Sequence, residues 1–227
     1  AVGCPVWIYG EHFSAFEAHG RFVFQDMDGL LDLPLPALPG RHQLANAATA
    51  IAALRAGGFV LTEAGAERAM QAVSWPARMQ RLAHGTLVDL APQGAEIWLD
   101  GGHNPDGAAM AAEFLAAREE EVERPLFMIV GMLNTKDATG YLRVFDGLVR
   151  HVFTVPVPDS EAGYDPEALA DEALAAGLSA EPMDDVGSAL RLIAESWNGL
   201  ERPPRILIGG SLYLAGQVLS DNGTPPD

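Results

Sequence analysis

The sequence contains one cysteine, Cys4, and one lysine, Lys136, in 227 residues. A single cysteine cannot form a disulfide within the chain, which is typical of a reducing compartment, so we expect a cytoplasmic protein. Positive charge is scarce as well, because 14 Lys and Arg stand against 31 Asp and Glu and give a net charge of −17. Such an acidic surface repels phosphate backbones and therefore disfavours nucleic acid and anionic membranes as partners.

Several sequence signals are missing. No segment is apolar over the length of a membrane span, and the start "AVGCPVWIYG" lacks the basic residues and long apolar core of a signal peptide. The chain begins without Met and with residues typical of a strand, so we expect a portion of a longer protein. The only lysine is followed by Asp, which excludes the Gly-Lys-Ser/Thr of a P-loop, and Gly-x-Ser-x-Gly and Gly-x-Gly-x-x-Gly are absent too.

The first third of the chain predicts strands followed by two helices. Residues 1 to about 36 contain the β-rich runs "PVWIYG" and "RFVFQ", and "DMDG" is a turn signal. A helix is expected from residue 41 until Gly57-Gly58 end it, and Thr62 caps a second helix over "LTEAGAERAMQAV". The apolar positions of the first helix recur at helical spacing: Leu44, Ala47, Ala48, Ile51 and Leu54.

After residue 82 the pattern changes to strands that alternate with helices. The expected strands are "GTLVDLA", "EIWLD", "PLFMIVGML", "HVFTVPV" and "RILIGG". The expected helices are "PDGAAMAAEFLAARE", "TGYLRVFDGLVR", "PEALADEALAAG", "VGSALRLIAESWNG" and "SLYLAGQVLS". This alternation predicts an α/β fold with a Rossmann-like, mostly parallel sheet and helices on both faces. We expect one domain over 1–74, a connector over 75–82, the α/β domain over 83–220 and a disordered tail over 221–227.

The predicted strands end in unusual residues. These ends are Asp100-Gly101-Gly102-His103, Gly131 leading to Lys136-Asp137, Val155 leading to Pro156 and Pro158, and Gly209-Gly210-Ser211. Parallel strands place them along one edge of the sheet, where ligands bind in such folds. The glycines let backbone amides approach a ligand closely, although Gly-Gly before a helix is also ordinary turn geometry.

Each candidate side chain has a structural alternative. Asp100 and His103 have a spacing found in metal sites, but no second His or carboxylate pair lies nearby in sequence, so we expect no metal site. His103 is then either a ligand hydrogen-bond donor or a cap on the next helix. Lys136 could neutralise a phosphate or pair with Asp137, or it could be a solvated loop lysine beside that aspartate.

Two further polar residues lie outside these loops. Asn46 points about 200° away from Leu44 around its helix, at roughly 100° per residue, so it is either an exposed amide or one that contacts a base. Arg78, in the connector, could reach a ligand between two domains or be an ordinary linker residue.

Five stretches together resemble the folylpolyglutamate synthase/dihydrofolate synthase family of the Mur-ligase superfamily. They are "LPGRHQLANAATAIAAL", "WPARMQRL", "WLDGGHNPDGAAMAAEFL", "MIVGMLNTKD" and "ILIGGSLYLAGQVL", in the family's order and over most of the chain. The resemblance implies an ATP-dependent ligase that joins glutamate to a folate or dihydropteroate carboxylate through an acyl phosphate. It implies small-molecule partners only, and we expect a monomer.

The resemblance also implies where the parts of the ATP site lie. In this family an ATPase domain carries the P-loop and the Mg²⁺ ligands, and residues 1–74 are similar to the end of that domain. By the same resemblance, Asn46 contacts adenine, Arg78 reaches the ATP phosphates, and Asp100 and His103 contact the nucleotide. His103 also joins Lys136 and Asp137 as expected catalytic residues, the last two on the glutamate side.

The chain departs from the family at three points. Ala77 replaces the usual glycine before the arginine, which could stiffen the hinge, and Gly102 replaces the usual alanine before the histidine, which should be harmless. The P-loop is missing, so we expect the chain to be inactive alone. A non-catalytic nucleotide-sensing or interaction module stays open as an alternative, and "GGSLYLAG" argues against a ligase for a cell-wall nucleotide precursor.

Overall fold

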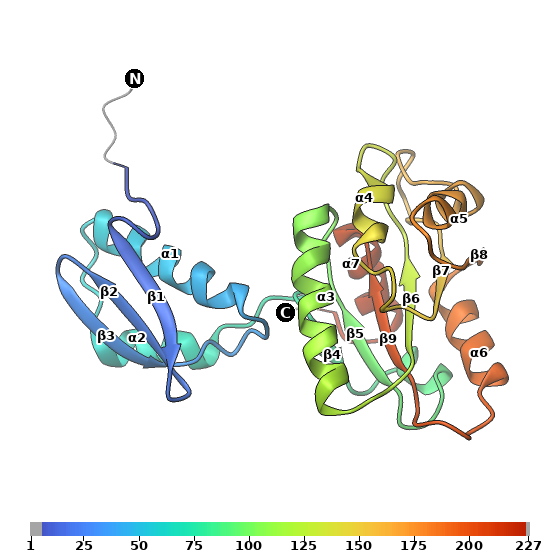
Figure 1. The fold of residues 1–227 in the computed structure, drawn as a ribbon, viewed down its shortest axis with the longest axis horizontal. Helices are drawn as coiled ribbons and strands as arrows, with labels where there is room; N and C mark the ends of the chain where they lie inside the picture. The colour runs from blue at the N-terminus through green and yellow to red at the C-terminus, as the bar shows by residue number, and fades with distance from the viewer. Residues whose placement is uncertain (1–5, 226–227) are drawn as a thin grey trace. The chain divides into compact units, whose positions relative to one another are not determined.

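The computed structural model describes residues 6–225, and the chain divides between Trp75 and Pro76 into two compact units (Figure 1). Cys4 lies outside the described residues. The strand expected over residues 5–10 is wrong where the structure describes it, because Tyr9 forms only an isolated bridge. A tight turn follows there, in which Gly10 has φ +87° and the Ile8 amide donates to the His12 ring.

The first unit is a three-stranded antiparallel sheet covered by two helices. The strands β1 (Phe13–Ala18), β2 (Arg21–Asp26) and β3 (Gly29–Pro34) lie in that order. The helices α1 (His42–Ala56) and α2 (Glu63–Ala72) pack on the face that presents the buried phenylalanines of the sheet.

The predicted helices of this unit are confirmed, with one difference in the core. Thr62 caps α2 by accepting a hydrogen bond from the Gly65 amide at 3.2 Å. Ala48 and Ile51 are buried as expected, but Leu54 is 40% exposed. Helical spacing indicates the direction of the apolar stripe, but it does not show how far along α1 the sheet reaches.

The second unit is a six-stranded sheet in the order β4-β5-β9-β6-β7-β8. Its strands are β4 (Gln80–Leu82), β5 (Glu96–Leu99), β6 (Leu126–Val130), β7 (His151–Thr154), β8 (Ala180–Pro182) and β9 (Arg205–Gly209). Only β4 runs antiparallel to its neighbour. The predicted mostly parallel α/β fold is therefore confirmed.

Helices cover both faces of this sheet, because its central strands are apolar on both sides. Within β5, Trp98 faces one core cluster, and Ile97 and Leu99 face the other. The first cluster includes residues of α3 (Pro105–Glu121), α4 (Ala138–Arg143) and α5 (Pro166–Ala175). The second includes residues of α6 (Val186–Ser196) and α7 (Leu212–Asp221), so the helices form two opposite layers (Figure 1).

The chain order places a topological switch point beside β9. The chain leaves β5 for α3 on one face of the sheet, whereas it leaves the neighbouring β9 for α7 on the other face. Loops that diverge in this way open a crevice at the carboxyl ends of the two strands. Asp100 and Gly210 are the residues that directly follow these strands.

Two predicted elements are shorter than expected or different in kind, and one strand is additional. Residues 85–91 contain the 3₁₀ turn η1 (Val88–Leu90) in place of a strand, because the Asn222 side chain accepts from the amides of Leu87 and Val88. The helix expected over 139–150 ends at Arg143, and turns that follow it lead to Gly147 at φ +75°. The edge strand β8 was not predicted.

The expected connector and tail also differ from the structure. Residues 80–82 of the connector form β4, which pairs with β5. The disorder expected from residue 221 is wrong at its start, because Asn222 is 2% exposed and donates to the His84 carbonyl at 2.9 Å. Polar, glycine-containing sequence predicted a free end, but one buried amide side chain anchors it. Residues 226–227 lie outside the described part.

Candidate functional site

Three of the four predicted strand ends meet at the switch point. The Asp100 amide donates to the Ile208 carbonyl at 3.0 Å, and the Gly131 amide donates to the Gly209 carbonyl at 3.2 Å. The loops after β5, β9 and β6 therefore start side by side. A side chain at Gly210 would collide with Val130 and with the carbonyl of Gly131, so only glycine permits this packing.

Asp100 joins the connector to the loop after β5. One carboxylate oxygen accepts from the Met79 amide at 2.9 Å, and the other accepts from the Gly102 amide at 2.7 Å. The Gly101 amide adds a third link by donating to the Ala77 carbonyl at 2.8 Å. Asp100 is only 7% exposed, so its charge is stabilised by backbone donors and holds two loops in register.

Arg78 is presented by an unusual backbone. The residues on either side of it, Ala77 and Met79, are buried and have φ of +55° and +43°. Non-glycine residues adopt this left-handed conformation at a cost of roughly 1–2 kcal/mol each, and the surrounding bonds must maintain it. The bonds to Asp100 and Gly101 do so, and the half-buried Arg78 is held in a fixed position between them.

The Arg78 side chain lies against the glycines of the β5 loop. A side chain added at Gly101 would meet the Arg78 guanidinium at 3.1 Å and collide with Leu212. The guanidinium also donates to the Ala77 carbonyl at 3.2 Å. The structure thus brings together Arg78 and the loop of Asp100 and His103, which are 22 and more residues apart in sequence.

His103 does not cap the helix that follows. The cap of α3 is Asn104, whose side chain accepts from the Gly107 amide at 2.8 Å. The Nδ1 of His103 lies 3.1 Å from the Gly101 carbonyl. Because a carbonyl only accepts, this contact places the proton on Nδ1 and leaves Nε2 as an acceptor, which can bind a ligand donor but does not supply the predicted donor.

Tyr141, on α4, is a site residue that sequence reasoning missed. It is 1% exposed, and its hydroxyl lies 3.2 Å from the position that a side chain at Gly209 would take. Within the described chain no group meets this hydroxyl with hydrogen-bond geometry. Burial and the negative charge of Asp100 raise the pKa of Tyr141 far above its ordinary value, so it stays neutral. An apolar helix containing one tyrosine gives no local signal of this position.

Lys136 and Asp137 follow β6 but have separate surroundings. Asp137 caps α4 by accepting from the Gly140 amide at 2.8 Å, and no ion pair joins it to Lys136 within residues 6–225. The half-buried Lys136 lies on a loop that bonds to the β7–α5 loop, where the Asn134 amide donates to the Ala162 carbonyl at 2.7 Å. The pairing of Lys136 with Asp137 is therefore wrong.

Asn46 belongs to the first unit, where it is exposed on α1. Its side-chain nitrogen donates to the Gln43 side chain at 3.0 Å. Gln43 is buried and also contacts the ring of His42 at 2.9 Å. This chain of polar contacts orients the Asn46 amide on the outer face of the helix.

Two absences complete the description of residues 6–225. No group of three or more His, Cys, Asp or Glu side chains in this range could hold a metal ion. No helix in it combines the length and hydropathy needed to cross a membrane.

The comparisons with known proteins agree with this architecture. Residues 77–211 match the family described as Mur ligase, glutamate ligase domain. The Escherichia coli dihydrofolate synthase/folylpolyglutamate synthase is 27% identical over 205 residues, which cover 87% of this chain and 42% of that protein. The chain therefore spans less than half the length of this relative.

Two solved structures show the same fold. The Mycobacterium tuberculosis folylpolyglutamate synthase complexed with ADP and AMPPCP gives a TM-score of 0.76 at 24% identity over 96% of this chain and 50% of that one. The Yersinia pestis bifunctional enzyme complexed with AMPPNP and a Mn ion gives 0.75 at 25% identity over 93% and 46%. The sequence match and the shared fold show that the chain belongs to the Mur ligase family, through its glutamate ligase domain.

Proposed function

We propose that this chain is the C-terminal portion of an ATP-dependent ligase that adds L-glutamate to the carboxylate of a folate or dihydropteroate. The observation that supports this most is the arrangement of Arg78, Asp100 and His103 at the switch point of a Mur ligase domain. The names of the relatives give the substrates, and their complexes with ADP, AMPPCP and AMPPNP suggest the nucleotide.

The residues at the switch point suit a nucleotide phosphate. ATP supplies the phosphoryl group that turns a carboxylate into an electrophile with a leaving group. Arg78 offers a guanidinium fixed by its strained backbone, and fixed positive groups stabilise the charge that develops during phosphoryl transfer. The start of α3, directly after His103 and Asn104, adds a helix dipole that favours negative charge.

The other predicted residues have more distant roles in this proposal. Asp100 acts mainly by holding the Met79 and Gly102 amides, so that Arg78 and His103 stay in register. Lys136 and Asp137 serve the glutamate side, and Asn46 contacts adenine from the first unit. Residues 1–74 would be the end of the ATPase domain.

A divalent metal does not fit the residues described here. The Yersinia structure contains a Mn ion, but residues 6–225 of this chain offer no cluster of ligands for one. We therefore assign Mg²⁺ binding, like the P-loop, to an ATPase half that this sequence does not contain. The chain alone would lack half of the ATP site and would be inactive.

The experiment that tests the proposal is glutamate ligation by the full-length protein, with dihydropteroate and tetrahydrofolate assayed in parallel. ATP-dependent incorporation of labelled glutamate into either substrate is the expected result, and no incorporation into both would refute the proposal. Arg78→Ala should lower turnover strongly while the unfolding midpoint moves little. Unchanged turnover in that variant would remove Arg78 from the site.

One observation favours a second candidate. The only lysine, Lys136, precedes Asp, so the sequence holds no Gly-Lys-Ser/Thr, as in a domain that senses nucleotide without catalysis. Such a module would bind ATP by itself and would have no ATPase half encoded upstream of Ala1. Reading the coding sequence upstream of Ala1 separates the two candidates directly.

A further inference from the structure

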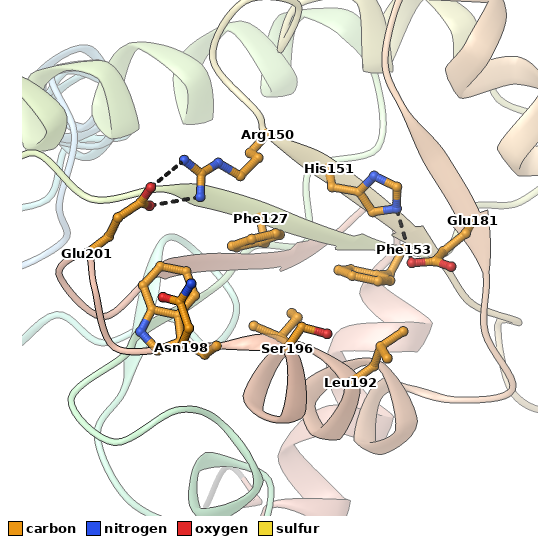
Figure 2. Close-up of a pocket in the computed structure, with 11 residues that line it drawn as sticks. Phe127, Arg150, His151, Phe153, Glu181, Leu192, Ser196, Asn198 and Glu201 are labelled. Atoms are coloured by element: carbon orange, nitrogen blue, oxygen red, sulfur yellow. Dashed lines mark hydrogen bonds and ion pairs between the residues drawn. The ribbon is translucent and has the colours of Figure 1, made fainter.

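A hollow lies at the opposite end of the strands from the switch point. It has a volume of about 400 Å³ and is formed by the amino ends of β6 and β7, by β8 and by the end of α6 (Figure 2). Its lining includes three aromatic side chains, Phe127, Phe153 and Trp197. A cavity of this size is typical of small-molecule sites, and none of the residues proposed for the ligase reaction lines it.

Aromatic rings form the apolar part of this pocket. The Phe127 ring lies 6.3 Å from Phe153 and 6.4 Å from Trp197, the latter edge-to-face. Phe127 is only half-buried, although it belongs to an interior strand of the sheet. An apolar ring left partly open at the amino end of β6 offers a surface on which a flat ligand can stack.

Two acidic side chains border the pocket, and their charges are neutralised to different degrees. Glu201 accepts two hydrogen bonds from Arg150, at 2.8 and 3.2 Å, so its charge is already matched (Figure 2). Glu181 has one ion-pair partner in the described part of the chain, His151, whose Nε2 lies 3.2 Å away. That contact lacks hydrogen-bond geometry, and Nε2 is a buried nitrogen without a hydrogen-bond partner in the described chain.

A carboxylate beside aromatic rings is suited to an ammonium group on a flat ligand. An ammonium donates several hydrogen bonds and accepts none, so it matches the carboxylate oxygens of Glu181, whose side chain is about half exposed. The His151 ring packs edge-to-face on Phe153 at 5.0 Å, which places the pair of His151 and Glu181 directly beside the aromatic surface. The end of α6 has no basic residue in its last turn to offset the negative end of its dipole.

We propose that this pocket binds a small aromatic cation, with the ammonium on Glu181 and the ring on Phe127, Phe153 and Trp197. The formal charges of the lining favour this sign, because Glu181 and Glu201 face a single arginine, Arg150. The acidic chain as a whole attracts cations and repels anions. The proposal does not depend on the ligase function, because the two sites lie at opposite ends of the strands.

Three probes of one shape test the charge preference. Tyramine, tyrosol and 4-hydroxyphenylacetate share a phenol ring and differ in carrying an ammonium, a hydroxyl or a carboxylate. We expect tyramine to bind the chain at least threefold more tightly than tyrosol, and the carboxylate to bind most weakly. Equal affinity of tyramine and tyrosol would overturn the proposal.

Nitrogen–proton correlation spectra localise the binding. Tyramine should shift the indole signal of Trp197. It should leave the indole signal of Trp98 unchanged, because Trp98 belongs to the core cluster on the other face of the sheet. The indole signals are assigned with Trp197→Phe. Shifts that leave Trp197 unmoved, or that are confined to the loop of Asp100, would place the ligand elsewhere and overturn the proposal.

Matched variants separate the ammonium site from general acidity. Glu181→Gln should weaken tyramine binding at least threefold and remove the preference over tyrosol. Glu195→Gln makes the same charge change on an exposed residue of α6 outside the lining, and it should leave the affinity within twofold of the parent. Trp197→Leu should weaken all three probes alike. An equal loss of tyramine affinity in Glu181→Gln and Glu195→Gln would mean that only the net charge of the chain matters, and it would overturn the proposal.

Discussion

The two edges of the six-stranded sheet are built in different ways. At the amino ends of β5 and β9, Arg205 is 1% exposed and bonds to Glu96 at 3.0 Å and to Glu119 at 2.9 Å. Burial alone would raise the pKa of Glu96, but the hydrogen bond and charge of Arg205, with help from Arg124 and Arg81, hold it below its ordinary value. At the carboxyl ends, by contrast, glycines and backbone amides surround a single carboxylate, Asp100.

This difference separates stability from ligand binding. The charges at the Arg205 network satisfy one another, so this network holds the strands together and has little left to offer a ligand. The carboxyl edge instead keeps Ala77 and Met79 in strained conformations and orients Arg78 and His103 by backbone bonds. Substitutions in the Arg205 network should therefore affect the free energy of unfolding, and those at the carboxyl ends should affect local order.

The largest effect is expected from breaking the amino-edge network. Arg205→Met leaves Glu96 and Glu119 without their buried partner and also removes donors to the Arg118 and Val122 carbonyls. Removing one member of a buried ion network costs about 3–5 kcal/mol, so the free energy of unfolding in urea should fall by about that amount.

A matched control shows whether burial is the cause. Arg150→Met removes an arginine that also bonds to a glutamate, but both side chains are about half exposed, at 50% and 49%. Water screens such a pair, so the urea midpoint should move far less than with Arg205→Met. Equal losses in the two variants would contradict the role assigned to burial.

A smaller effect is expected at the carboxyl edge from Asp100→Asn. The amide group keeps one acceptor oxygen but turns an N–H toward one of the two backbone donors, Met79 or Gly102. The free energy of unfolding should fall by about 1–3 kcal/mol, the usual cost of an unsatisfied buried donor. Hydrogen exchange of the Met79 amide should accelerate more than that of amides in α3. Asp106→Asn, on an exposed residue of α3, should leave the Met79 amide protected.

Ala77→Gly tests strain at the same edge with a still smaller net effect. Relief of the left-handed conformation stabilises by about 1–2 kcal/mol. Loss of a buried methyl group costs about 0.8 kcal/mol, and the freer unfolded chain costs about 0.4–1 kcal/mol. These three contributions nearly cancel, so the free energy of unfolding should change by less than about 1 kcal/mol. Hydrogen exchange of the Arg78 and Met79 amides should nevertheless accelerate. Unchanged exchange would show that Ala77 does not stiffen this segment.

The same contrast explains what could be predicted from the sequence. Parallel strands, helices and caps such as Thr62 follow from local patterns, and the glycine-rich ends of β5, β6 and β9 predicted their meeting point. Contacts between segments that are distant in the chain produce no such local pattern in the sequence. The hydrogen bonds of Asn222 stabilise a turn where a strand was predicted. Tyr141 reaches the switch point from a helix whose sequence indicates only burial. Contacts across the fold were therefore missed, whereas the place where the glycine-rich loops meet was predicted.

The smallest expected effect is that of ATP on the melting temperature of this chain. Arg78 and His103 offer contacts to a nucleotide, but no Gly-Lys-Ser/Thr loop is present to surround its phosphates. If the dissociation constant is on the order of 10 mM, then roughly 5 mM ATP stabilises the chain by about 0.2 kcal/mol. For a chain of this size that corresponds to a shift of about 1 °C or less. A shift of many degrees would mean that the carboxyl edge binds nucleotide unaided, and it would favour the sensing module over half of a ligase site.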